Sequence, residues 1–149
     1  MYLDVGNSEK VVSFKNFTPT LKNNLLSQQS NFCKTFTNPT RLQIISVLID
    51  EVFDEDGCLK KVLRELNVTE ILSAIKDEFD IDLSQTTLSQ HLAILRNHHV
   101  IIARRDGNNI FYKVANPKII DACCLVREIV IDQMKKTATI SDSLPENIF

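Results

Sequence analysis

The sequence lacks the features that would assign it to several common functional classes. No apolar stretch approaches the roughly 20 residues that span a bilayer, and polar residues interrupt the first twelve positions, where a signal peptide would be apolar. We therefore expect an unprocessed cytoplasmic protein without membrane contact. There is no Gly-rich phosphate loop and no Cys–His pair at an interpretable spacing, so we expect neither an enzyme nor a cofactor.

Cysteine is sparse, and its four occurrences form no framework. Their spacing is irregular, without a C-x-x-C pair or a secretory context, so we expect reduced thiols. The adjacent Cys123 and Cys124 leave two interpretations open. Buried free cysteines pack as small hydrophobic residues, whereas accessible ones could form a thiol sensor for arsenite, a soft metal or an oxidant, with Cys33 as a third thiol.

The net charge of −2 argues against a nonspecific binder of polyanions, but the charge is unevenly distributed. Residues 1–49 carry a net charge of +3, residues 50–82 carry −7, and residues 83–113 carry +3. The acidic stretch is most simply a solvated face that is turned away from phosphate, and the positive charge lies in the segment where we expect DNA contacts.

Apolar residues at helical spacing predict a mainly α-helical first half. We expect a first helix over residues 20–37, and Asn38-Pro39 supplies a cap and a first turn for a second helix whose apolar stripe runs to Val52. Residues 54–57 predict a polar turn, since their offsets do not match a calcium loop. Further expected elements are a short helix formed by Leu59, Val62, Leu63 and Leu66, and a helix opened by a capping box at Asn67.

The second half is expected to combine a helix, a β-hairpin and a last helix. Ser84 is a good N-cap for a helix that ends near Asn97. Two β-favouring segments, 100–105 and 110–114, are joined by residues that tolerate positive φ, which predicts a hairpin. The last helix opens at Asn116-Pro117 and is apolar around much of its circumference, so it needs a second partner.

These elements predict one domain over residues 20–136. Residues 1–19 are then an N-terminal extension, and residues 137–149 form a tail without periodicity that we expect to be mobile.

The helix that follows Ser84 has an apolar face and a polar face. Leu88, Leu92 and Leu95 form the apolar face, and short polar side chains lie opposite them near the N-terminus. Gln can bond bidentately to adenine, and Ser or Thr can donate to or accept from base edges, so the polar face suits a major groove. Any solvated helix could look the same. The order of elements favours the DNA interpretation, because a hairpin with cations on both sides of its tip follows.

Three segments, taken together, resemble the signatures of the ArsR/SmtB repressors. They are Asn38–Leu42, Leu83–Arg96 and Arg104–Val114, and the resemblance covers about residues 20–135. It implies a mainly α winged helix-turn-helix with a two-stranded β wing, dimerised through its first and last helices. The DNA-binding residues that we expect are Gln85, Thr86, Ser89, Gln90, Arg96, Arg104, Arg105, Asn108 and Lys113.

The metal sites of that family are not expected in this chain. Where many members have E-L-C-V-C-D-L, the matching stretch has Asn67 and Thr69 in place of the two thiols. A second family site uses positions on the last helix, where this chain offers the poor zinc set of Asp121, Cys123, Met134 and Thr137.

The histidines also give no metal site. His98 and His99 point apart at a helix end and suit a polar helix C-terminus, while His91 is expected to be a partly buried structural or DNA-proximal residue.

The expected function is repression by a homodimer that occupies an imperfect palindrome in double-stranded operator DNA, with its effector left open. The alternative is a winged-helix module that docks another protein without binding DNA, and a thiol enzyme is a third, weaker hypothesis.

Overall fold

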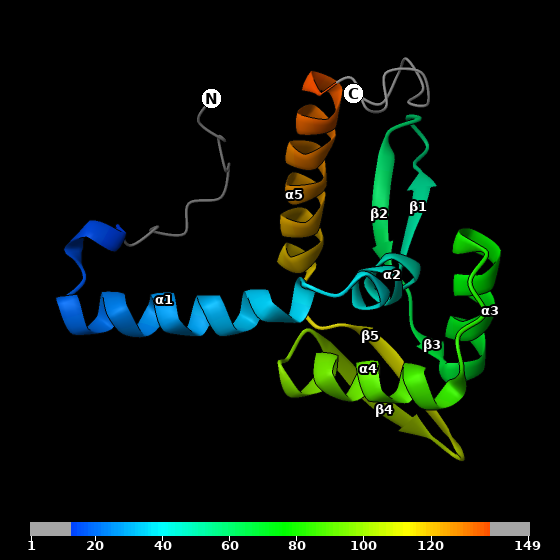
Figure 1. Ribbon diagram of the computed structural model, residues 1–149. Helices are drawn as coiled ribbons and strands as arrows, with labels where there is room; N and C mark the ends of the chain where they lie inside the picture. The colour runs from blue at the N-terminus through cyan, green and yellow to red at the C-terminus, as the bar shows by residue number, and fades with distance from the viewer. Residues whose placement is uncertain (1–12, 138–149) are drawn as a thin grey trace. The chain divides into compact units, whose positions relative to one another are not determined.

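A computed structural model describes residues 13–137 of the chain (Figure 1). The chain divides between Thr37 and Asn38 into two compact units, which are described separately below. Most of the expected N-terminal extension, and all of the expected tail except Thr137, lie outside the described residues. No helix within residues 13–137 is long and apolar enough to cross a membrane.

The N-terminal unit consists of one α-helix between two short 3-10 helices. The elements are η1 (Phe14–Asn16), α1 (Pro19–Cys33) and η2 (Lys34–Phe36), and α1 with η2 accounts for the helix predicted from the sequence. Thr18 caps α1 by accepting a hydrogen bond from the backbone N–H of Leu21, and Pro19 occupies the first turn. Leu21, Leu25 and Leu26 are 40–52% exposed, so α1 carries an apolar stripe that stays exposed in the described part of this unit, residues 13–37.

Three helices form the core of the second unit: α2 (Pro39–Val47), α3 (Val68–Phe79) and α4 (Gln85–Asn97). Each begins where the sequence predicts a cap, because the side chains of Asn38, Asn67 and Ser84 all accept hydrogen bonds from first-turn backbone N–H groups. The helices pack on one another, and α4 also packs on strand β4. The core side chains include Ile44, Ile45, Leu48, Ile71, Ile75, Leu88, Leu92, Leu95, Val100 and Ile101.

A three-stranded antiparallel sheet follows α4 and contains the predicted hairpin. Its order is β3 (Leu66–Asn67), β5 (Asn109–Val114) and β4 (Ile101–Asp106). Gly107 occupies the first central position of the two-residue turn and has a φ of +60°. Glycine adopts positive φ there without steric cost. The hairpin prediction is confirmed, and the short strand β3 adds an edge that the sequence did not indicate.

The acidic segment corrects two predictions. Helix α2 ends at Val47 instead of continuing to Val52, and the short helix over residues 59–66 is absent. In their place, β1 (Ile49–Phe53) and β2 (Leu59–Leu63) form an antiparallel hairpin, here called the insertion hairpin.

The hydrogen bonds of the turn explain why the helix predicted in this segment is absent. Asp54 accepts hydrogen bonds from the backbone N–H groups of Asp56 and Cys58 at 3.0 and 2.8 Å, and Gly57 has a φ of +77°. These bonds close a tight turn that brings Phe53 opposite Leu59. Leucine and valine at helical spacing are equally compatible with a strand once a turn pairs them.

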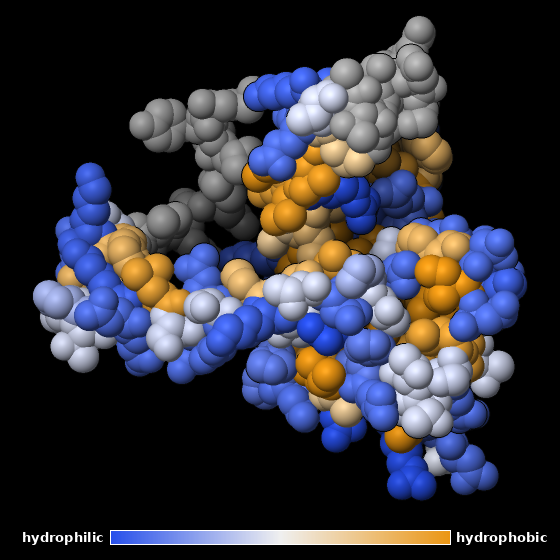
Figure 2. Space-filling view, viewed as in Figure 1, coloured by the Kyte–Doolittle hydropathy of each residue, from blue (hydrophilic) through white to orange (hydrophobic). Residues whose placement is uncertain are grey.

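The last helix, α5 (Pro117–Lys136), was predicted correctly and has two apolar faces. On one face Ile120 is buried and Cys124 is half-buried, and this face lies beside the insertion hairpin (Figure 1). The other face carries Leu125, Val126, Ile129 and Val130, which are 44–60% exposed, and Figure 2 shows apolar surface over this helix. Within residues 38–137, this second face therefore stays exposed.

Candidate nucleic-acid interface

The pair α3 and α4 forms a helix-turn-helix whose turn is held by local bonds. Asp80 ends α3 in the left-handed region with a φ of 53°, and the backbone N–H of Asp80 bonds the carbonyl of Lys76. Lys76 Nζ lies 2.9 Å from a carboxylate oxygen of Asp80 and 3.0 Å from one of Asp82. These contacts account for the raised pKa of Lys76, and they neutralise part of the acidic turn that precedes α4.

Helix α4 presents an exposed polar face at its N-terminal end. The buried Leu88, Leu92 and Leu95 hold the opposite face in the core, so helical geometry sets which side chains point outward. The outward side chains line a shallow concave surface of about 550 Å³ and include no acidic group: they are Gln85, Thr86, Ser89, Gln90 and Ala93. The structure thus brings the four predicted α4 contacts onto one face; that they bind bases stays a prediction.

The predicted wing cations lie on two different faces of the sheet. Arg105 is paired with Ile110, on the same face as the buried pair Ile101 and Val114 that meets the core. Arg104 and Lys113 lie on the opposite face. The wing therefore offers cations to both sides of the sheet.

Arg104 is already bound within the protein. Its Nε and Nη2 atoms donate hydrogen bonds to the two carboxylate oxygens of Glu65 at 2.9 and 3.1 Å, and its guanidinium lies 5.2 Å from the ring centroid of Phe111. Accordingly, the pKa of Glu65 is lowered by Arg104 and the pKa of Arg104 is raised by Glu65. Glu65 was not predicted as part of the site, because its segment was expected to be helical and turned away from phosphate.

Asn108 and Arg105 lie at the wing tip. Asn108 is in the two-residue turn, and Arg105 Nε donates a hydrogen bond to the carbonyl of Gly107 at 3.2 Å. Both side chains belong to exposed residues, so the tip is accessible to a phosphate backbone.

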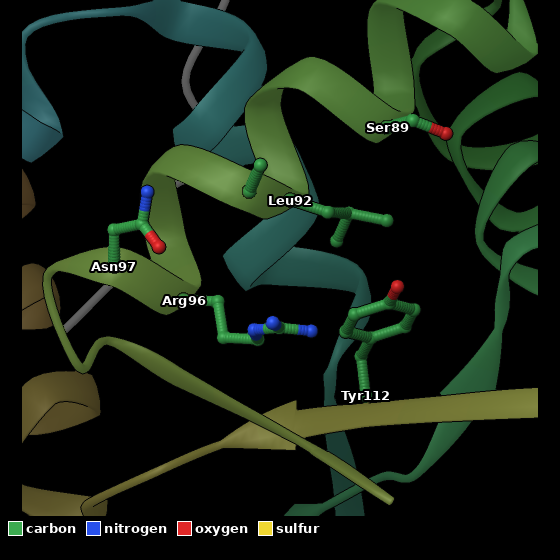
Figure 3. Close-up of a pocket in the computed structure, with 6 residues that line it drawn as sticks. Ser89, Leu92, Arg96, Asn97 and Tyr112 are labelled. Carbon is green, nitrogen blue, oxygen red and sulfur yellow. The ribbon is translucent and has the colours of Figure 1, made fainter. Parts of the chain in front are cut away.

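A small pocket joins α4 to the wing (Figure 3). It has a volume of about 140 Å³ and is lined by Ser89, Leu92, Ala93, Arg96, Asn97 and Tyr112. The Arg96 and Tyr112 side chains both project into the space between α4 and β5. A guanidinium and hydroxyl groups around one hollow are suited to an anionic oxygen such as that of a phosphate. Tyr112 was missed, although strand alternation with Ile110 and Val114 places it on the α4 side.

His91 occupies the side of α4 that faces α2. It is half-buried, its Nδ1 atom is buried without a hydrogen-bond partner among the described residues, and burial together with Arg41 lowers its pKa. The imidazole is therefore neutral near pH 7, which agrees with a structural residue close to the interface. No group of three His, Cys, Asp or Glu side chains in residues 13–137 is placed to hold a metal ion.

The three thiols of the predicted sensor belong to different units. Cys123 and Cys124 are adjacent and half-buried on α5, whereas Cys33 is exposed and belongs to the N-terminal unit. Burial raises the pKa of Cys123. Cys124 instead accepts a hydrogen bond from Lys61 of the insertion hairpin, at 2.8 Å.

Comparisons with known proteins agree with this geometry. No protein-family model matches the chain. An uncharacterised HTH-type transcriptional regulator of Mycobacterium tuberculosis, Rv0081, is 28% identical over 120 residues, which are 80% of this chain and 90% of that protein. The crystal structure of Rv0081 superposes with a TM-score of 0.58 over 76% of this chain and 96% of that one. The transcriptional repressor PagR of Bacillus anthracis is 30% identical, with a TM-score of 0.50, over 70% of this chain and 98% of its own.

The chain belongs to the ArsR/SmtB family of winged helix-turn-helix transcriptional regulators. The resemblance inferred from its three sequence segments is therefore confirmed. A fold comparison agrees: Mb0332 of Mycobacterium bovis, described as a homodimeric winged helix-turn-helix domain and a possible ArsR-family regulator, has a TM-score of 0.58 at 24% identity, over 81% of this chain and 94% of that one.

Proposed function

We propose that this regulator is a homodimeric repressor that occupies a palindromic operator in double-stranded DNA, with α4 in the major groove. The observation that carries the proposal is the exposed face of α4, where Gln85, Thr86, Ser89 and Gln90 line one concave surface that contains no acidic side chain. Gln and Ser side chains at the N-terminal end of a recognition helix can reach base edges.

The wing and the pocket beside α4 contribute contacts to the DNA backbone. Arg105 lies at the wing tip and Arg96 lines the pocket between α4 and β5, so each can neutralise a phosphate beside the groove. Such contacts set the register and orientation of the protein on the duplex, while the α4 side chains choose the sequence.

Dimerisation is inferred from the apolar surface that the described residues of each unit leave exposed. The exposed stripe of α5 around Val126 and Ile129, and that of α1 around Leu21 and Leu25, are the surfaces that the family resemblance assigns to the dimer interface. A two-fold dimer presents two copies of α4 about 34 Å apart, one turn of DNA, and therefore reads a palindrome.

Selection of bound duplexes from a random DNA pool tests this proposal. We expect an imperfect palindrome to be enriched. In Gln85→Ala with Ser89→Ala, discrimination between the selected site and random DNA should fall by roughly 1–3 kcal/mol for each base that is no longer bound. Ser73→Ala, an exposed serine on α3, is the matched control and should leave discrimination unchanged. Failure to enrich any sequence would favour a protein-docking role for the same surface, and intact preference in the double variant would show that α4 does not read the bases.

A further inference from the structure

A lysine of the insertion hairpin lies against a cysteine of the last helix. Lys61 on β2 donates from Nζ to Sγ of Cys124 on α5 across 2.8 Å, although the two residues are 63 positions apart in the sequence. Lys61 lies on the hairpin face that also carries Ile49 and Leu63, the pair at the base of the hairpin. The fold, not local sequence, therefore brings the cation to the sulfur.

We propose that Cys124 is a peroxide-reactive thiol, with Lys61 as the cation that holds its sulfur and protonates the oxygen that leaves. The proposal does not rest on DNA binding by this protein. It assigns Cys124 one ligand class, small hydroperoxides, because a half-buried sulfur beneath a hairpin admits a compact oxidant more readily than a bulky electrophile.

The surroundings of Lys61 keep its amine protonated. The hydrogen bond to Cys124 is the largest cause of its raised pKa, and the charges of Glu51 and Asp121 add to the effect. A protonated amine beside a sulfur atom is a setting in which protein thiols react as nucleophiles.

The adjacent Cys123 provides a contrast within the same helix turn. Burial raises the pKa of Cys123, which keeps that thiol protonated and unreactive. The two neighbours also cannot bridge each other without strain, so the product is expected to stop at a sulfenic acid instead of a disulfide.

The reaction balances with one peroxide. The Cys124 thiol first loses its proton to solvent. Its sulfur then attacks one peroxide oxygen, so that an S–O bond forms and the O–O bond breaks. The departing hydroxide takes a proton from the Lys61 ammonium and leaves as water, and Lys61 regains a proton from solvent. Sulfur is oxidised by two electrons to the sulfenic acid, and the peroxide is reduced by two electrons.

Competition among the four thiols of the full-length protein tests the proposal. Limiting hydrogen peroxide is added with dimedone, which traps sulfenic acids, and labelling at each cysteine is followed by peptide mass spectrometry. Exposure alone predicts that Cys33 and Cys58, both exposed, react before the half-buried Cys124. We expect Cys124 to be labelled about tenfold faster than either of them. Faster labelling of Cys33 or Cys58 would overturn the proposal.

Variants of the two neighbouring lysines isolate the role of the cation. Lys61→Met should slow labelling of Cys124 about tenfold, and Lys61→Arg should restore most of the rate. Lys60→Met is the matched control, since Lys60 lies on the other face of β2, 3.1 Å from Asp54, and its loss should leave the rate at Cys124 unchanged. Equal rates in Lys61→Met and wild type would overturn the role of Lys61. If Lys61→Met unfolds the hairpin by circular dichroism, the order of labelling in the wild-type protein still decides whether Cys124 is the reactive thiol.

Discussion

Residues 13–137 contain two antiparallel hairpins of similar length that are used in opposite ways. The wing, β4 and β5, gains a third strand and buries Ile101 and Val114 in the core. The insertion hairpin has only two strands, and Phe53 near its tip is 74% exposed. Both turns contain a glycine with positive φ, so turn chemistry does not distinguish them. A two-stranded hairpin alone is only marginally stable in water. The difference therefore shows that the packing partner of a hairpin, and not its turn, decides how firmly it is held.

The largest expected effect is a difference between the two hairpins in how much a truncated side chain lowers the stability of the protein. Ile101→Ala removes a side chain that is 1% exposed and should lower the free energy of unfolding by about 2–5 kcal/mol. Phe53→Ala truncates a larger residue in the insertion hairpin but should cost less than about 1 kcal/mol, since little of its surface is buried. Urea unfolding of both variants measures the difference. Similar losses would mean that the insertion hairpin is as well packed as the wing.

The second prediction concerns the charges of the two hairpins. Arg105→Ala should weaken binding to operator and random DNA alike and should flatten the log–log salt dependence by about one unit, because it removes one phosphate contact. Arg104→Ala should flatten it less, since Glu65 already pairs with Arg104. Affinity is measured between 50 and 200 mM salt, a range in which phosphate contacts change affinity strongly. Lys60→Ala in the insertion hairpin is the control, and a change of slope there would place that hairpin on DNA as well.

A third prediction sharpens the role of Glu65, which directly precedes β3. Glu65→Gln removes the carboxylate that binds Arg104 and so frees a wing cation. We expect tighter binding to DNA of any sequence and a salt slope steeper by up to about one unit. The combined variant Glu65→Gln with Arg104→Ala should lose this gain. A gain that persists without Arg104 would show that Glu65 acts by general repulsion of phosphate and not through Arg104.

The smallest expected effect is a difference in acid titration between two carboxylates: Glu65, which pairs with the wing, and Asp54, which closes the turn of the insertion hairpin. The pKa of Glu65 lies below its ordinary 4.5 chiefly because of Arg104, whereas the pKa of Asp54 lies below its ordinary 3.8 chiefly because the backbone N–H of Cys58 bonds it. Both carboxylates therefore stabilise the fold above these ordinary values and lose that contribution as the pH falls through the lowered ones.

Carboxyl chemical shifts followed by NMR check this prediction. Arg104→Met should return the pKa of Glu65 toward 4.5, while Lys60→Met should return the pKa of Asp54 only part of the way toward 3.8. A return of the pKa of Asp54 all the way to 3.8 in Lys60→Met would mean that the ion pair with Lys60, and not the turn, lowers this pKa.

The sequence correctly predicted the parts of the fold that depend on residues a few positions apart. Asn38, Asn67, Ser84 and Asn116 cap their helices as their side-chain chemistry indicates, since a cap needs only backbone N–H groups two or three residues away. The wing turn, which contains Gly107, was also predicted from its sequence. The four polar side chains of α4 could be placed on one face because the leucine stripe opposite them sets the orientation of the helix.

The sequence by itself determined the helix starts, the wing turn, the polar face of α4 and the family signatures, because each of these depends on residues a few positions apart. Only the tertiary structure decided that residues 49–63 form a hairpin, that Glu65 holds Arg104 and that Lys61 meets Cys124. These pairs are 39 and 63 positions apart, and no periodicity encodes which distant side chains a fold brings together. Leucines at helical spacing can enter a helix or a strand, and the pairing partner that the turn at Asp54 supplies decides between them.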